Sequence, residues 1–84
     1  MKNKKKLINQ IIYRSTHRGT KEMDILLGAF VKKYIQNLNE KDLTKLIDIL
    51  YIEDEILYDW YFNKKYYKKI PENNVAELLK NFKL

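Results

Sequence analysis

The sequence predicts an all-α protein, a compact five-helix bundle that forms a single domain. Apolar residues recur at the three- and four-residue spacing of amphipathic helices, and no stretch sustains the alternation typical of strands. Pro71 is the only proline, so almost nothing interrupts these helical patterns. A length of 84 residues allows one modest core. A compact domain of that size has a radius of gyration of roughly 12 Å.

Two apolar stripes predict the first two helices. Residues 1–6 precede them and are rich in lysine, so we expect a flexible basic tail at 1–6 and a helical domain at 7–84. Phe30, in the second stripe, is a bulky residue expected to anchor the core. The stripes consist of Leu7, Ile8, Ile11, Ile12 and Ser15, and of Met23, Leu26, Leu27, Phe30, Val31, Tyr34 and Leu38.

Three further helices are predicted by their start signals. Asn39 followed by Asp42 is typical of an N-cap, and the acids at 53–55 are interpreted as exposed partners of the dipole of a fourth helix. Pro71 suits the first turn of a fifth helix, and residues 63–70 are a linker. Trp60 is expected to be a second core anchor. The inward-facing residues are Leu43, Leu46, Ile47 and Leu50, then Ile56, Leu57, Trp60 and Tyr61, then Val75, Leu78, Leu79 and Phe82.

The net charge of +6 is concentrated near the start of the chain. Residues 1–21 hold seven basic side chains and no acid, whereas residues 22–84 hold ten basic and eleven acidic ones. This segment is either an electropositive patch that steers an acidic partner or a solvated lysine tail. It lacks the features of a signal peptide or of a mitochondrial presequence. We therefore expect a bacterial cytoplasmic location rather than the mitochondrial matrix, and no membrane insertion.

Few residues are suited to catalysis. The chain has no cysteine, and His17 is its single histidine, so a metal site is not expected. Asp54, Glu55 and Asp59 are better interpreted as exposed helix-terminal acids than as a catalytic pair. No glycine-rich phosphate loop is present. We expect no enzyme, no catalytic residue, no metal and no stably bound cofactor, because a filled 84-residue bundle offers no sizeable pocket.

An RGxxE element, Arg18 to Glu22, stands between the first two helical patterns. Arg14 and Arg18 are the only arginines among seventeen basic residues, which suggests a need for the planar, two-pronged guanidinium. Gly19 is expected to adopt a left-handed or otherwise open conformation. Arg18 and Glu22 would then lie side by side on the surface. They would either contact a partner or form an internal salt bridge that ties the turn together.

Two segments together resemble a known family. The run from Tyr13 to Phe30 resembles the pattern RSxHRGTxELDLLLGxF of the small flavin assembly factors of succinate dehydrogenase, the SdhE type. The element Leu57-Tyr58-Asp59-Trp60 is similar to the family's DPDLYDW element. Asp54-Glu55-Ile56 stands where the family has Asp-Pro-Asp, and Met23 replaces a leucine. The residues after Asn63 match nothing in the family pattern.

The resemblance implies a function without catalysis by this chain. Such factors bind the flavoprotein subunit of succinate dehydrogenase and promote covalent attachment of FAD, which is the client's cofactor. The flavoprotein of fumarate reductase is a further client by the same resemblance. The free factor is expected to be a monomer. The residues expected to bind the partner are Arg14, His17, Arg18, Gly19, Glu22, Asp24, Tyr58, Asp59 and Trp60.

The alternative is a small basic helical module that binds nucleic acid or acts as an adaptor. The basic start of the chain and the helix–turn–helix spacing favour it. Acids balance the basic residues beyond position 21, and no later helix shows a purely basic face. That balance argues against nucleic acid as the partner, while composition alone leaves the adaptor open.

Overall fold

A computed structural model describes residues 2–84 of the chain. Within that range there are five α-helices and no strand, which confirms the predicted all-α fold. The radius of gyration is 12.0 Å, as expected for one compact domain of this length. The helices are α1 (Lys2–Ser15), α2 (Lys21–Tyr34), α3 (Glu40–Leu50), α4 (Asp54–Phe62) and α5 (Asn74–Lys80), and a short 3-10 helix (Ile35–Asn37) extends α2.

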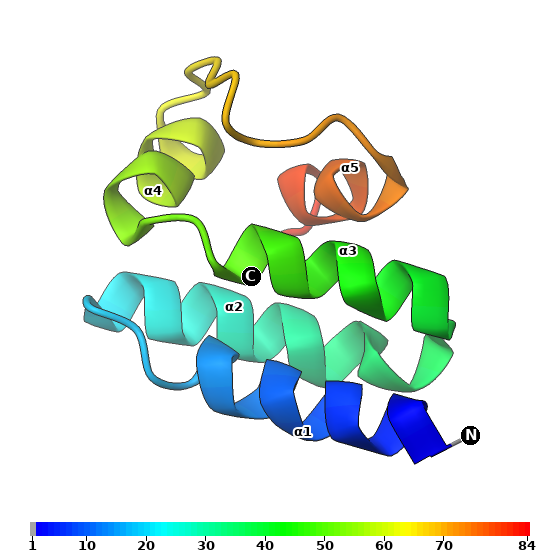
Figure 1. The fold of residues 1–84 in the computed structure, drawn as a ribbon. Coiled ribbons are helices and arrows are strands. Elements are labelled where there is room, and N and C mark those ends of the chain that lie inside the picture. The colour runs from blue at the N-terminus through cyan, green and yellow to red at the C-terminus, as the bar shows by residue number, and fades with distance from the viewer. Residues whose placement is uncertain (1) are drawn as a thin grey trace.

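Helix α3 lies at the centre of the bundle. It packs against α1 on one side and against α5 on the other, and α1 also contacts α2. Figure 1 shows α4 and α5 on the side of α3 away from α1, joined by the longest connection in the chain. The start of α4 and the α1–α2 connection lie at the same end of the molecule (Figure 1). That end holds the RGxxE element.

Side-chain caps explain where three helices begin. Thr20 accepts from the Met23 amide at 3.3 Å, and Asn39 accepts from the Asp42 amide at 2.8 Å, as its sequence context predicts. Asn73 accepts from the Ala76 amide at 2.8 Å and starts α5. The prediction that Pro71 lies in the first turn of α5 is therefore wrong, because the helix begins only after this Asn73 cap.

Helix α1 begins earlier than the sequence suggests. It starts at Lys2, so the predicted tail is helical as far as the structure describes it, and Met1 lies outside the described residues. Lysine is a good helix former, and no proline or glycine interrupts residues 2–6. The flexibility of this segment stays a prediction. Ile11 and Ser15 are buried as expected, but Ile12 is 46% exposed because it lies outside the face of α1 that packs against the bundle.

The core brings together side chains from all five helices. Phe30 is fully buried and Trp60 is 9% exposed, which confirms both as core anchors. Phe82, beyond the end of α5, returns to the core and meets the Phe30 ring edge-on at 5.4 Å between centroids. The Tyr61 hydroxyl donates to the Phe82 carbonyl and ties the end of the chain to α4.

Lys64 closes α4 in a left-handed conformation, with φ of 60°. The backbone amides of Asn63 and Lys65 both donate to the Asp59 carbonyl, at 3.0 and 3.2 Å, so the turn folds back onto the last turn of the helix. A side chain in this conformation costs about 1–2 kcal/mol relative to the ordinary helical region. Glycine avoids most of that cost, but it raises the conformational entropy of the unfolded chain, which offsets part of the gain.

We expect Lys64→Gly to raise the free energy of unfolding by about 0.5–1 kcal/mol, measured by urea denaturation. Lys68→Gly, in the same connection but without a positive φ, is the matched control and is expected to be neutral or destabilising. Equal effects of the two substitutions would show that the left-handed turn stores no strain.

Candidate functional site

Arg18 joins the α1–α2 connection to α4 through a shielded ion pair. Its Nη2 lies 2.6 Å from Asp54 Oδ1, and its Nε donates to the same oxygen at 2.8 Å. The side chains are only 8% and 17% exposed. The two residues are 36 positions apart, so this pair fixes the connection against the first turn of α4.

The same guanidinium also satisfies backbone carbonyls at two helix ends. Nη1 donates to the Leu50 carbonyl at 2.7 Å and to the Arg14 carbonyl at 3.2 Å, and Nη2 donates to the Ile52 carbonyl at 3.1 Å. The last carbonyls of a helix lack partners within it and carry partial negative charge. Lysine cannot reach this many acceptors in several directions at once, which explains the need for arginine.

The expected surface position of Arg18 is therefore wrong, although the argument from its forked geometry is sound. The guanidinium points inward because Asp54 Oδ1 and the carbonyl of Leu50, at the end of α3, accept its hydrogen bonds. The alternative of an internal pair with Glu22 is also wrong, since the acid partner is Asp54. Arg18 shapes the site from beneath the surface.

Gly19 is favoured by a close approach of Asp54 rather than by a left-handed backbone. Its amide donates to Asp54 Oδ2 at 2.6 Å, and a Cβ at this position would stand 3.1 Å from that oxygen. No glycine in the described residues has a positive φ, so the left-handed alternative predicted for Gly19 is wrong, and the other alternative, an otherwise open conformation, stays a prediction. The neighbouring Arg18 amide donates to Asp24 Oδ1 at 2.7 Å. Two carboxylates thus hold the turn from opposite sides.

Asp54 is the residue of the candidate site that the sequence interpretation missed. It was expected to be an exposed acid at a helix start, but its two oxygens bind Arg18 and Gly19. Local spacing carries no sign of a contact between positions so far apart. The one sequence feature that could have indicated Asp54 is its position, because it stands where the family has Asp-Pro-Asp. We call the Arg18–Asp54–Gly19 cluster the turn latch.

Glu22 remains free on the surface beside the turn latch. It is exposed in the first turn of α2, and no hydrogen bond or ion pair joins its side chain to another residue within 2–84. A hollow of about 360 Å³ lies next to the turn, lined by Thr20, Asp54, Glu55, Tyr58 and Asp59. Tyr58 is 39% exposed on the outer face of α4. Glu22 and this face of α4 offer acceptors that a partner can reach.

Arg14 and His17 line the same end of α1. The His17 ring stacks on Tyr13 with centroids 4.0 Å apart, and its Nδ1 lies 2.7 Å from the Tyr13 carbonyl. That contact holds the ring in one orientation and leaves its outer edge to solvent, since His17 is exposed. The Arg14 guanidinium lies 4.1 Å above the Tyr51 ring in a cation–π contact. Its buried Nε has no hydrogen-bond partner within the described residues.

Asp59 lines the same hollow as Tyr58, and both Asp59 and Trp60 are more buried than Tyr58. The Asp59 carboxylate accepts from the Tyr67 hydroxyl at 2.7 Å and from the side-chain amide of Asn63 at 2.6 Å. The Tyr67 hydrogen bond, with that of Asn63, holds the pKa of Asp59 below its ordinary value, and the same bond raises the pKa of Tyr67. Trp60 is largely buried. Asp59 therefore ties the 63–70 connection to α4, and Trp60 lies in the core.

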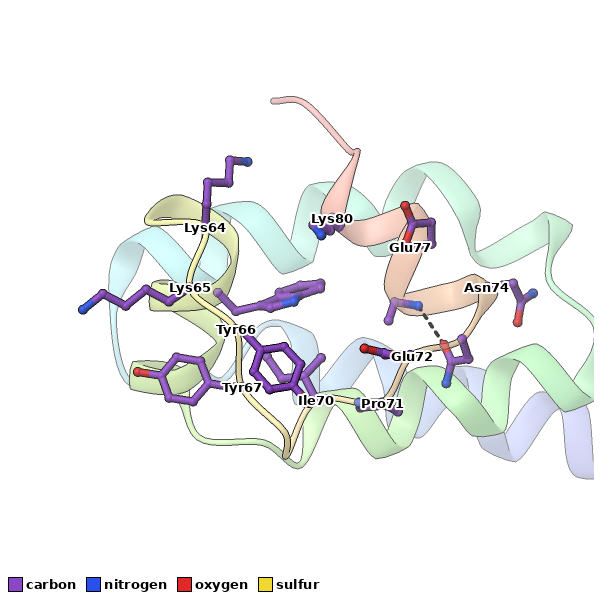
Figure 2. A pocket seen from close by; sticks show the side chains of 13 residues that line it. Lys64, Lys65, Tyr66, Tyr67, Ile70, Pro71, Glu72, Asn74, Glu77 and Lys80 are labelled. Carbon is purple, nitrogen blue, oxygen red and sulfur yellow. Dashed lines mark hydrogen bonds between the residues drawn. The ribbon is translucent and has the colours of Figure 1, made fainter.

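A groove of about 520 Å³ lies between α4, the following connection and α5 (Figure 2). The expectation that the bundle has no sizeable pocket is therefore wrong, because the long connection between α4 and α5 leaves a groove beside these helices (Figure 1). Within residues 2–84, no group of three or more histidine, cysteine or acidic side chains is placed to hold a metal ion. No described helix is long and apolar enough to cross a membrane.

Comparison with known proteins identifies relatives over most of the chain. Residues 9–83 match the family model described as flavinator of succinate dehydrogenase. The chain is 35% identical over 68 residues to the FAD assembly factor SdhE of Acetobacter pasteurianus, an alignment that covers 81% of this chain and 60% of that protein. It is 36% identical over 58 residues to the mitochondrial succinate dehydrogenase assembly factor 2 of Arabidopsis thaliana, covering 69% of this chain and 31% of that protein.

A third relative extends further along the chain. The mitochondrial succinate dehydrogenase assembly factor 2 of Dictyostelium discoideum is 33% identical over 75 residues, covering 89% of this chain and 51% of that protein. The chain thus spans between about a third and three fifths of the length of these relatives. No solved structure was found to match.

Proposed function

The chain belongs to the family of succinate dehydrogenase flavinators, and from that premise we propose that it is an assembly factor for a flavoprotein. It binds the flavoprotein subunit of succinate dehydrogenase and promotes covalent attachment of FAD there. FAD is the client's cofactor, and the bond forms within the client. The flavoprotein of fumarate reductase is a second client, and the setting is the bacterial cytoplasm, where the free factor is a monomer.

The observation that carries this proposal is the pairing of a rigid turn with an unpaired acid. The turn latch and the Asp24 bond hold the backbone around Glu22 in one shape. Glu22 itself keeps both carboxylate oxygens free of partners within the described residues. A surface prepared in this way loses little conformational entropy on binding, which favours a partner of fixed shape.

The predicted partner-binding residues divide into two groups by exposure. Glu22, His17 and Tyr58 are exposed, and we assign to them the direct contacts with the flavoprotein. The others act by positioning, because their side chains are engaged within the bundle or because they leave room for a neighbour. The positioning group is Arg14, Arg18, Gly19, Asp24, Asp59 and Trp60, together with Asp54.

Such a factor works by holding its client rather than by reacting. A bound carboxylate such as Glu22 can accept hydrogen bonds from amides or cationic side chains of the flavoprotein. Those bonds stabilise one conformation of the client over others. The factor raises the yield of attached flavin if that conformation is the one in which the bond forms.

The test is a flavin-attachment assay with the apo flavoprotein subunit and FAD, read as in-gel flavin fluorescence after denaturation. We expect the protein to increase the covalent signal. Glu22→Gln should weaken binding to the subunit by about 10- to 100-fold, the usual effect of losing a charge-assisted hydrogen bond. Asp48→Asn, an exposed acid on α3 outside the site, is the matched control and should behave like the unchanged protein.

Fluorescence that is equal with and without the protein would overturn the assembly role. Equal weakening by both substitutions would instead show that net charge, and not the position of Glu22, governs binding.

A further inference from the structure

The groove between α4 and α5 is rigidly built. Residue Ile70, in the connection, is only 4% exposed and fixes the connection to the core. The Tyr67 hydroxyl is bonded to Asp59, and Lys69 Nζ lies 2.7 Å from Glu53 Oε1. On the other wall, the Asn73 cap orders the start of α5. The groove is thus bounded by fixed segments on both sides.

Basic charge is concentrated around this groove. Residues 60–84 hold six lysines and two glutamates, a local excess hidden in the near-neutral balance of residues 22–84. Lys64, Lys65 and Lys80 line the groove, and no ion pair joins any of them to another described residue. Figure 2 shows Lys80 on the α5 side, with Lys64 and Lys65 extending outward at the α4 end.

The groove also exposes an aromatic ring above an apolar floor. Tyr66 is 75% exposed and stands at the groove (Figure 2), so its ring is open to an incoming side chain. Trp60, Ile70 and Ala76, all largely buried, form the floor. An apolar side chain entering beside Tyr66 would cover this surface and leave the lysines at the edge.

We propose that the groove binds an acidic peptide segment of a protein partner, with one aromatic or large apolar side chain seated beside Tyr66. Carboxylates of the segment flank that side chain and meet the unpaired lysines. The fixed walls lower the entropic cost of holding an extended chain. This site is separate from the turn latch and does not rest on the proposed function.

The charges of the groove favour a peptide over a nucleic acid. Glu72 and Glu77 also line the groove, and Figure 2 shows Glu72 directed along it. A nucleic-acid strand carries a phosphate at every step, and these glutamates would repel it. A peptide has backbone amides that can donate to the glutamates, and its acids can be spaced to meet only the lysines.

Trp60 provides a direct measurement, because it is the only tryptophan and lines the groove. The probe is an acetylated and amidated octapeptide with one central phenylalanine among glutamates and aspartates, titrated into the full chain. We expect a saturable change in Trp60 fluorescence that weakens as salt rises. A peptide with lysines in place of the acids should produce no saturable change.

Two variants test the residues that carry the proposal. Lys80→Glu should weaken the affinity for the octapeptide by about three- to ten-fold, since it replaces an attraction with a repulsion. Tyr66→Ala should weaken it by a similar factor through lost ring contact. Lys41→Glu, the same charge change at an exposed position of α3, is the control and should change affinity by less than about two-fold, because screening limits distant charges.

Several results would overturn the proposal. The first is the absence of any saturable change, and the second is equal binding of the basic peptide. Tighter binding of an oligothymidylate or of flavin mononucleotide than of the octapeptide would assign the groove to a different ligand. A sedimentation result showing that the chain dimerises through Tyr66 would assign it to a second copy. All of these measurements are made without the flavoprotein, so they are independent of the attachment assay.

Discussion

Replacing Arg18 with alanine is expected to lower the free energy of unfolding by about 2–4 kcal/mol, because it removes one member of a largely shielded ion pair together with several hydrogen bonds. Asp54 would lose its guanidinium, and the carbonyls of Leu50 and Ile52 would lose their donors. Thermal unfolding should shift down by roughly 4–8 °C for each kcal/mol in a domain of this size. Flavin attachment should fall with it, because the turn latch no longer shapes the site.

Arg18→Lys separates charge from geometry. It keeps the positive charge but loses most of the hydrogen bonds, so we expect roughly half of the alanine effect. Lys69→Ala is the control, since it breaks an ion pair of 2.7 Å whose side chains are more than half exposed. It should cost less than about 1 kcal/mol. An Arg18→Ala protein as stable as the Lys69→Ala protein would show that the turn latch contributes nothing to the fold.

Phe30→Ala is the second substitution with a large expected effect, about 3–5 kcal/mol. Phe30 is fully buried, and its ring contacts those of Tyr34 and Phe82, so truncation leaves a cavity where α2 meets the end of the chain. The measurement is chemical denaturation followed by circular dichroism.

Ile25→Ala on the same helix is the matched control. Ile25 is 53% exposed, and its truncation should change the free energy of unfolding by no more than about 0.5 kcal/mol. If Phe30→Ala were equally mild, the core around α2 would have to be able to collapse into the vacated space.

The helices could be predicted from the sequence because helix signals are local. Apolar spacing and the cap at Asn39 depend on residues within one or two turns. Phe30 and Trp60 were identifiable as core residues by size and position in a stripe. Pro71 was wrongly placed in the first turn of α5, because a proline is compatible with a first turn but does not require a helix to begin there. The start of α1 was missed because lysines are as common in tails as in exposed helical turns.

The site could be predicted only in part, because its determining contacts are not local. The sequence identifies the turn, its glycine and the need for a guanidinium at Arg18. It does not reveal that Asp54, distant in sequence, is the partner, so Arg18 was expected outside and Asp54 was interpreted as a cap. The groove was missed for a related reason. Its walls come from two helices and a connection, and its charge is masked by acids elsewhere in the chain.

The span of the turn latch has a consequence for the order of folding. Arg18 reaches residues 32, 34 and 36 positions away, so its bonds require the closure of a long loop and the prior docking of α3 and α4. A chain that has formed only α1 and α2 lacks every one of these acceptors. We therefore expect the turn latch to close after the local bond between the Arg18 amide and Asp24 has formed, so a fully fixed turn beside Glu22 indicates that α3 and α4 are already docked.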